Sequence, residues 1–299
     1  MKKSEVVTIL GSQSYKCENY NSHIVSWSPP EDSSTLIYTT VNSNEIIRIT
    51  NRWEYFEYIY DDKGRDLLSN KKSNTSALDV IFKDPGRHKI YVKFIPLQTN
   101  LTGCFYGCFN LYKVSEDLFK GCSNVISIIN IFRNCQLLSE IPKELFIYFP
   151  NLKYIEGCFA GCDSLTYIPE KLFINNNKIT SFEECWYMCS NLKTIPEDLF
   201  QYTPEVETVR YCFCYCYNLS QISNNLFDNC FKIANFGSCF KQCNILITPS
   251  GINNIELWER TSYDEFPRII NGIHCFENCS SIPNYYDIQR NGDKYYVKY

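Results

Sequence analysis

The chain has 299 residues, is 44% hydrophobic, and carries 29 lysines and arginines against 33 aspartates and glutamates, for a formal net charge of −4. This composition supplies ample apolar residues for a core, and it argues against both a disordered chain and a nucleic-acid-binding protein, which would carry clustered positive charge. No apolar run approaches the roughly 20 residues of a membrane-spanning helix, so we expect no membrane span.

Residues 1–98 are predicted to form a β-rich N-terminal domain resembling a small β-sandwich, which covers the first unit of the segment that follows. Pro85 and Gly86 suit a type I or II turn between the last two strands. The expected strands are short segments rich in Tyr, Ile, Val and Thr, namely Glu5–Leu10, Thr35–Thr40, Glu45–Thr50, Tyr55–Tyr60, Ala77–Phe82 and His88–Phe94.

The first residues do not favour export. Val6–Leu10 is too short for the apolar region of a signal peptide, and Cys17 follows Ser-Tyr-Lys rather than a lipobox. We therefore expect the protein to be cytoplasmic at synthesis, with a virion or the cell surface as alternative final locations.

Residues 99–249 repeat with a period of 27 residues. Four residues before most of the cysteines that mark this period lies a second cysteine, replaced once by Ile131, and an aromatic residue follows it. A fixed period of this length is typical of a solenoid, in which each repeat is one coil. The marking cysteines are Cys108, Cys135, Cys162, Cys189, Cys216 and Cys243.

Apolar residues within each repeat are mostly three apart, a spacing that fits neither a long helix nor a regular strand. We expect about six to seven coils built from short parallel strands plus single helical turns. The helical turns are expected to begin at Pro142, Pro169 and Pro196, each of which has an acidic residue nearby.

Residues 250–299 are predicted to form an irregular C-terminal cap. The next cysteine pair, Cys275 and Cys279, arrives nine residues late. Ile255–Arg260 is expected to form a helical turn that places Trp258 on the last coil, and Asp293–Tyr299 a closing edge strand.

The 17 cysteines are interpreted as reduced thiols that fill the core, because Ile131 can occupy the same position. Stacked coils lie close enough for disulfides, but a column of equivalent thiols has no unique pairing and the total is odd. A zinc site is the alternative, although the sulfurs would lie among apolar neighbours and the histidines lie mostly elsewhere. We predict no metal and no cofactor.

Two cysteines raise the question of catalysis. Cys214 lies between the two repeating positions and is expected to be exposed, which leaves a reactive thiol open. Cys275 follows His274, but adjacent residues on a strand point to opposite faces, and no third group orients the pair. We therefore predict that the protein is not an enzyme.

The segment Cys158–Pro169 follows the pattern F-x-x-C-x-x-L-x-x-I-P closely. In this it resembles the BspA-like and mycoplasma-type lipoprotein leucine-rich repeats, and the resemblance covers about half of the chain. It implies a leucine-rich-repeat solenoid of the kind found on microbial surfaces and in bacteriophages of gut bacteria, acting in adhesion or as a structural module.

Tyrosines at positions outside the expected core are the strongest indication of function. Because each position recurs from coil to coil, they would gather into stripes, and tyrosine is enriched in interfaces. The alternative is that each lies flat on its own coil with its hydroxyl in water. The candidate partner-binding residues are Tyr112, Tyr154, Tyr167, Tyr187, Tyr211 and Tyr215.

These observations favour a non-enzymatic module that uses one flank of the repeats to bind a protein or glycan partner, in adhesion or in assembly. The alternative is a structural component of a bacteriophage virion, such as a capsid-decorating, tail or fibre-associated protein, assembled into a larger particle.

Overall fold

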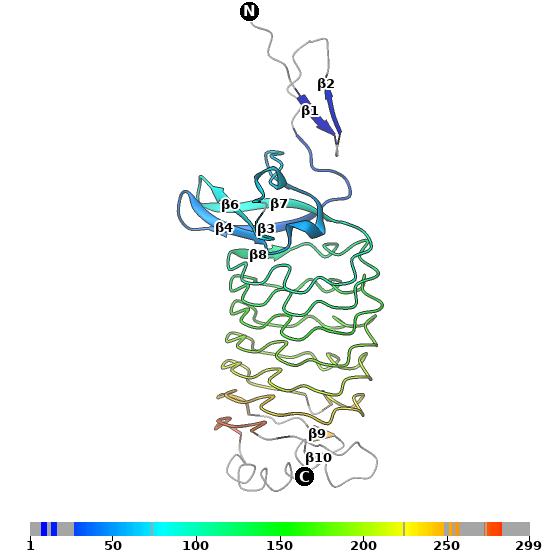
Figure 1. The fold of residues 1–299 in the computed structure, drawn as a ribbon. Helices are drawn as coiled ribbons and strands as arrows, with labels where there is room; N and C mark the ends of the chain where they lie inside the picture. The colour runs from blue at the N-terminus through cyan, green and yellow to red at the C-terminus, as the bar shows by residue number, and fades with distance from the viewer. Residues whose placement is uncertain are drawn as a thin grey trace, which may run out of the picture.

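The computed structural model describes residues 7–10, 13–16, 27–72, 74–223, 225–247, 251–252, 255–256, 272 and 274–282 (Figure 1). Its strands and two short 3-10 helices are β1 (Val7–Leu10), β2 (Gln13–Lys16), β3 (Ser34–Thr40), β4 (Glu45–Thr50), η1 (Trp53–Tyr55), β5 (Phe56–Asp61), η2 (Leu68–Asn70), β6 (Leu78–Phe82), β7 (Gly86–Phe94), β8 (Leu111–Val114), β9 (Gly251–Ile252) and β10 (Ile255–Glu256).

The strands form small antiparallel sheets. The largest has the order β5-β7-β3-β8, and β4 pairs with β6, β1 with β2, and β9 with β10. The edge strand β8 belongs to the first repeat, and its Leu111 lies opposite Tyr38 of β3. The first repeat is therefore joined to the N-terminal sheet by strand pairing.

The prediction of a leucine-rich-repeat solenoid, with coils of short parallel strands plus helical turns, is wrong. In the described part of the chain there is no α-helix, and within the repeats β8 is the only strand with more than isolated bridges before residue 247. Pro142, Pro169 and Pro196 begin tight turns rather than helical segments. The regular structure is instead nearly all β, in small antiparallel sheets.

Between these sheets the chain runs through successive turns, and residues one period apart lie side by side (Figure 1). Single parallel bridges join Ser127 to Tyr154 and Tyr154 to Ser181, each 27 residues apart. We call residues 100–247 and 274–282 the turn stack. Its coils are numbered from coil 1, which contains Cys108, to coil 7, which contains Cys279.

Backbone hydrogen bonds explain why the apolar residues are three apart. The N–H groups of Cys104 and Cys108 donate to carbonyls three residues earlier, closing tight turns, whereas those of Phe105 and Gly107 donate to carbonyls of coil 2. N–H groups therefore bond alternately within the coil and to the next coil. Each turn buries one apolar side chain, so the period of three is that of the turns.

In every coil the residue immediately before each of the two repeating core positions has a positive φ. Glycine and asparagine adopt this conformation most easily, and the third position of a type II turn requires it. From coil 1 to coil 7 the first of these positions holds Gly103, Asn130, Gly157, Glu184, Tyr211, Ser238 and His274, and the second holds Gly107, Asn134, Gly161, Met188, Tyr215, Gln242 and Asn278.

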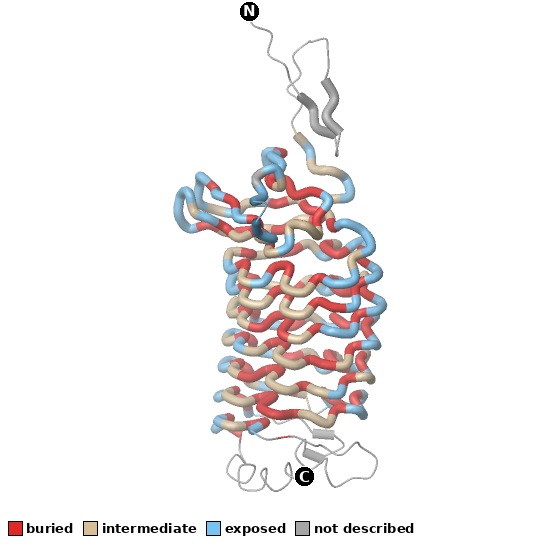
Figure 2. The backbone as a smooth tube through the Cα atoms, viewed as in Figure 1, coloured by how far each residue is buried: buried red, intermediate tan, exposed pale blue. Residues whose placement is uncertain are grey.

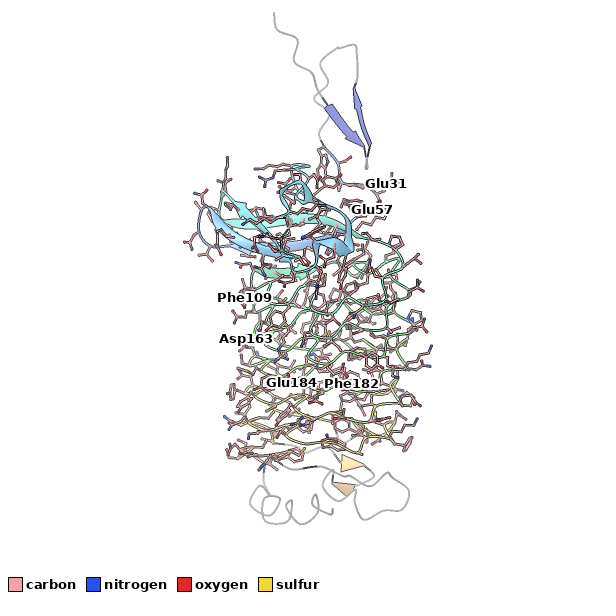
Figure 3. All side chains as sticks on the ribbon, viewed as in Figure 1. Glu31, Glu57, Phe109, Asp163, Phe182 and Glu184 are labelled. Atoms are coloured by element: carbon pink, nitrogen blue, oxygen red, sulfur yellow. The ribbon has the colours of Figure 1, made fainter. Side chains whose placement is uncertain are left out.

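The interior of the turn stack is a column of parallel aromatic rings. Phe105 and Phe132 lie 5.4 Å apart with their planes at 2°, and Phe240 and Phe276 lie 5.5 Å apart at 10°. The column therefore continues into coil 7 despite the nine extra residues before it. Figure 2 shows buried and exposed segments alternating along each coil. In Figure 3 side chains fill the interior, while Phe109 and Asp163, two periods apart, lie along one flank.

The two repeating cysteine positions differ in how regularly their thiols are hydrogen-bonded. At the first, where Ile131 also occurs, an apolar side chain suffices, although the thiol of Cys185 donates to the carbonyl of Ile155 with an S···O distance of 3.1 Å. At the second, the thiols of coils 2 to 7 donate to a carbonyl of the preceding coil, with S···O distances of 2.9–3.2 Å. Cys108 of coil 1 lies 3.6 Å from the carbonyl of Ile49 in β4. All sixteen cysteines of the described residues are free and buried.

Two predictions for the C-terminal region fall mostly outside the described residues. Asp293–Tyr299 lies outside them entirely, and of Ile255–Arg260 only the first two residues are described, as β10.

None of the helical segments described is long and apolar enough to cross a membrane.

Candidate functional site

Coils 4 and 5 depart from the turn chemistry of the earlier coils. At their positive-φ positions they carry Glu184, Met188, Tyr211 and Tyr215, with φ of 56°, 58°, 54° and 64°. A bulky residue in this region costs about 1–3 kcal/mol and is tolerated where the surrounding structure enforces it, often at a functional site. The backbone conformation therefore indicates a functional site in coils 4 and 5.

A pocket of about 310 Å³ lies at this place. We call it the tyrosine pocket, and its lining consists of Arg133, Glu184, Tyr187, Tyr211, Cys214, Tyr215 and Lys241. Four of these residues occupy one position of the repeat, since Arg133, Tyr187, Cys214 and Lys241 are separated by multiples of 27 residues. The others come from the two positive-φ positions beside it.

Three tyrosine rings form the aromatic part of the pocket. The ring of Tyr187 lies 5.6 Å from that of Tyr215 and 6.4 Å from that of Tyr211, with interplanar angles of 84° and 85°. Such edge-to-face contacts are the favoured geometry of aromatic pairs. Tyr187 therefore stands between rings from the next coil, and burial raises the pKa of its hydroxyl.

The charged residues of the pocket are paired. Arg133 Nη1 lies 2.7 Å from Glu184 Oε2, two coils away. Lys241 Nζ lies 2.9 Å from Glu277 Oε2, a hydrogen bond that raises the pKa of the lysine. Beside the pocket, Arg210 bonds to Glu183 at 3.0 Å and lies 4.6 Å above the ring of Tyr211.

The Arg133–Glu184 pair crosses coil 3, and small residues there make room for it. Coil 3 carries Gly157 and the buried Ala160 beneath the arginine. A Cβ atom on Gly157 would collide first with the side-chain oxygen of Asn130 and would also come within 2.9 Å of Arg133 Nη1. Glycine at position 157 thus allows both the positive φ of this turn and the close approach of the ion pair.

Replacing Gly157 by alanine is expected to cost more stability than replacing Gly121 by alanine. Both glycines have positive φ, so each substitution introduces about 1–2 kcal/mol of backbone strain. The space around Gly121 is open, whereas Gly157→Ala also displaces the side chain of Asn130 and moves Arg133 away from Glu184, and loss of this ion pair adds about 0.5–1 kcal/mol. Urea denaturation measures both. In a Glu184→Gln background the excess should shrink by the part that comes from the ion pair, and an excess that is unchanged there would contradict this account.

Cys214 forms part of the pocket and is fully buried. The prediction that it is exposed is wrong, because side chains from neighbouring coils cover it. Burial raises the pKa of its thiol to about 12, so the thiol is protonated and weakly nucleophilic at neutral pH. At the other predicted cysteine site, Cys275 is buried, whereas His274 is exposed and lies 2.9 Å from Glu277.

The structure brings three of the six candidate tyrosines together in the pocket, Tyr187, Tyr211 and Tyr215. The other three lie elsewhere. Tyr112 packs under Arg87, with 4.3 Å between guanidinium and ring centroid, and Tyr154 lies beneath Lys153 at 5.2 Å. Tyr167 is 45% exposed.

Sequence reasoning missed Arg133, Glu184 and Lys241. The 27-residue alignment contains the signal, since Arg133 and Lys241 share a column with Tyr187. The pairing of Arg133 with Glu184 depends on the small residues of coil 3, Gly157 and Ala160, which leave room for the two side chains to meet. The alignment alone does not reveal this.

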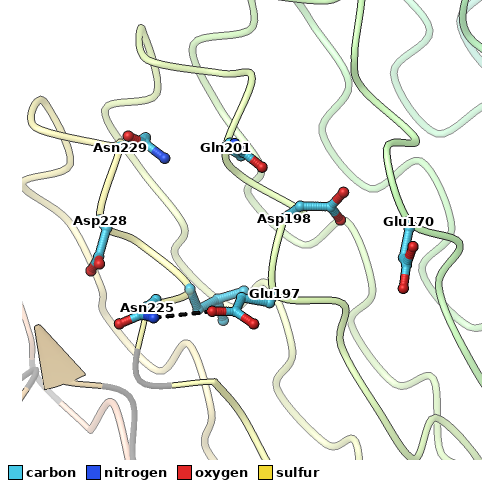
Figure 4. Close-up of a pocket in the computed structure, with 8 residues that line it drawn as sticks. Glu170, Glu197, Asp198, Gln201, Asn225, Asp228 and Asn229 are labelled. Carbon is cyan, nitrogen blue, oxygen red and sulfur yellow. Dashed lines mark hydrogen bonds between the residues drawn. The ribbon is translucent and has the colours of Figure 1, made fainter.

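A second hollow, of about 410 Å³, is acidic (Figure 4). Two of its carboxylates already accept hydrogen bonds from neighbouring coils. Asp198 accepts the N–H of Lys171 at 3.1 Å, and Glu197 accepts a hydrogen bond from Asn225 at 3.0 Å. Among the described residues no group of three or more histidine, cysteine, aspartate or glutamate side chains is placed to hold a metal ion.

A third hollow, of about 510 Å³, lies between coil 1 and the β4–β6 pair. Ile46 of β4 and Phe109 of coil 1 are exposed beside it, and Arg48 is paired with Asp79 across the two strands. This hollow has an apolar rim but lacks the clustered tyrosines of the first.

No family model and no curated protein matches the chain. Among solved structures, a chain in the Toll–Spätzle complex of Drosophila matches with 13% identity and a TM-score of 0.22, over 55% of this chain and 29% of that one. A TM-score this low supports no argument about fold or function.

Proposed function

We propose that the protein is a non-enzymatic recognition module that binds a protein or glycan partner through the tyrosine pocket. The observation that carries this proposal is the presence of Tyr211 and Tyr215 at positive-φ positions where coils 1 to 3 have glycine or asparagine. Their conformation is unfavourable, so stability of the fold alone would select smaller residues there.

The chemistry of the pocket supports binding rather than catalysis. Binding sites commonly combine aromatic side chains with a few fixed polar groups, and tyrosine offers a large contact area at low entropic cost. The tyrosine pocket has this composition. Its one thiol, that of Cys214, is buried with a raised pKa, Lys241 is paired with Glu277, and among the described residues no histidine lines the pocket.

The proposal is tested with Tyr187→Ala and Tyr215→Asn, each screened beside the wild type on arrays of immobilised proteins and glycans. Both variants are expected to lose at least about tenfold in affinity for the partners that the wild type binds. Tyr215→Asn should keep its free energy of unfolding within about 1 kcal/mol of wild type, because relief of backbone strain offsets the lost contacts with the rings of Tyr187 and Tyr217.

Tyr167→Asn is the matched control. It removes an exposed tyrosine on another part of the turn stack and should leave binding unchanged. If both pocket variants fold and bind every wild-type partner with unchanged affinity, the proposal is wrong.

A further inference from the structure

The size of the tyrosine pocket limits its occupant. Ligand pockets in proteins span roughly 300–1,000 Å³, and this one, at about 310 Å³, lies at the lower end. A single small ring fits such a volume, whereas a peptide segment with several side chains needs a longer groove. The pocket therefore favours a ligand that presents one ring at a time.

The charges of the pocket favour a neutral occupant. Arg133 already bonds to Glu184, and Lys241 to Glu277. An anion or a cation of comparable strength would have to break one of these pairs and leave the released partner unpaired. A neutral ligand avoids this, because guanidinium has five N–H donors and carboxylate several acceptor sites, so each pair can bond to it while remaining intact.

The lining of the tyrosine pocket combines aromatic ring faces with hydrogen-bonding groups. The rings of Tyr187, Tyr211 and Tyr215 supply apolar faces, and in the described part of the chain the hydroxyls of Tyr187 and Tyr215 make no hydrogen bond. Tyrosine is suited to ligands that are apolar on one side and wet on the other. A saccharide ring has this character, with C–H groups on its faces and hydroxyls around its edge.

We propose that the tyrosine pocket binds a neutral saccharide ring, stacked on a tyrosine face with its hydroxyls directed to the Arg133–Glu184 pair and Lys241. This inference rests on the proposed function and makes it specific, because it assigns the pocket to the glycan class of partner.

The test uses the full chain and a panel of methyl glycosides of glucose, galactose, mannose and N-acetylglucosamine, with sialic acid and galacturonate as charged comparators. Saturation-transfer NMR and titration should detect at least one neutral glycoside, with the largest transfer to ring C–H protons. Binding should fall at least about tenfold in Tyr187→Ala. Tyr167→Asn should bind as the wild type does.

A substitution that fills the pocket tests whether binding requires its open space as well as the residues that line it. Cys214→Met inserts a longer side chain behind the tyrosines and should abolish glycoside binding, whereas Cys214→Ala leaves the space open and should preserve it. Circular dichroism establishes that each variant is folded. A Cys214→Met variant that folds and binds glycoside normally would overturn the assignment.

Two other outcomes also overturn it, and they differ in what they leave standing. If only the charged sugars bind, or if a protein partner depends on Tyr187 and no saccharide binds or competes, the saccharide assignment fails while the proposed function stands. If no partner of any class depends on Tyr187 or Tyr215, the proposed function fails as well.

Discussion

Raising the pH from 8 to 10 in the presence of a reductant is expected to unfold the turn stack. Burial raises the pKa of its core thiols, to about 11 for Cys122, to about 12 for Cys279, and further for most of the others, including Cys135, Cys162 and Cys216. In the unfolded chain a thiol titrates near pH 8.5. Above that pH the unfolded state binds fewer protons than the native state, so stability falls as pH rises.

The expected effect is large because many thiols act together. Each thiol that stays protonated in the folded state lowers the free energy of unfolding by about 1.4 kcal/mol per pH unit above its unfolded pKa. A few such thiols exceed the 5–15 kcal/mol by which domains are typically stable. The fall should begin near pH 8.5, before tyrosines of the unfolded chain titrate near pH 10.

Urea titrations at half-unit pH steps measure the slope. Cys158→Ile provides a matched variant, because Ile131 already occupies the same position in coil 2. It removes one thiol and should reduce the slope by one proton. A free energy of unfolding that stays constant between pH 8 and 10 would contradict this account, because it would mean that the thiols release no protons on unfolding.

The N-terminal strands could be predicted from sequence because their signal is local. Glu45–Thr50 agrees with β4 at both ends, and Thr35–Thr40 and His88–Phe94 agree with β3 and β7 within two residues. Each is a run of β-branched and aromatic residues bounded by polar ones, which favours a strand in any tertiary context.

The conformation of the coils could not be predicted in the same way. Apolar residues three apart are compatible with a helical turn, a corner or a chain of tight turns, and the positive-φ positions decide among these. Glycine at 103, 107, 157 and 161 carries that signal, but Glu184, Met188, Tyr211 and Tyr215 hide it in coils 4 and 5. Three of these four residues, Glu184, Tyr211 and Tyr215, line the tyrosine pocket.

The burial of Cys214 could not be predicted from the sequence for a related reason. Its position in the repeat is occupied by Tyr106 in coil 1 and Arg133 in coil 2, both of which reach solvent. Cys214 is short, so Tyr187 from the coil before and Lys241 from the coil after lie over it. The exposure of Cys214 depends on its side-chain length relative to those of its neighbours in the coils before and after it. The repeat pattern describes each position separately and does not contain this comparison.

Trp186→Ala is expected to destabilise the protein by about 3–5 kcal/mol, the usual cost of truncating a large buried aromatic side chain. Trp186 is fully buried in the aromatic column, 6.1 Å from Phe159 and 5.4 Å from Phe213 between ring centroids. Because each coil is stabilised by its neighbours, a cavity in coil 4 weakens the stack on both sides. Chemical denaturation measures the loss.

Trp186→Phe should behave differently. Every other coil has phenylalanine at this position, and within the described residues the indole N–H of Trp186 has no acceptor. A buried donor left unpaired costs about 1–3 kcal/mol, so its removal offsets much of the lost ring volume and the variant should lie within about 1 kcal/mol of wild type. A loss of 3 kcal/mol or more would mean that the indole N–H is bonded in solution. The larger ring would then be a hydrogen-bonded part of coil 4 rather than a packing substitute for phenylalanine.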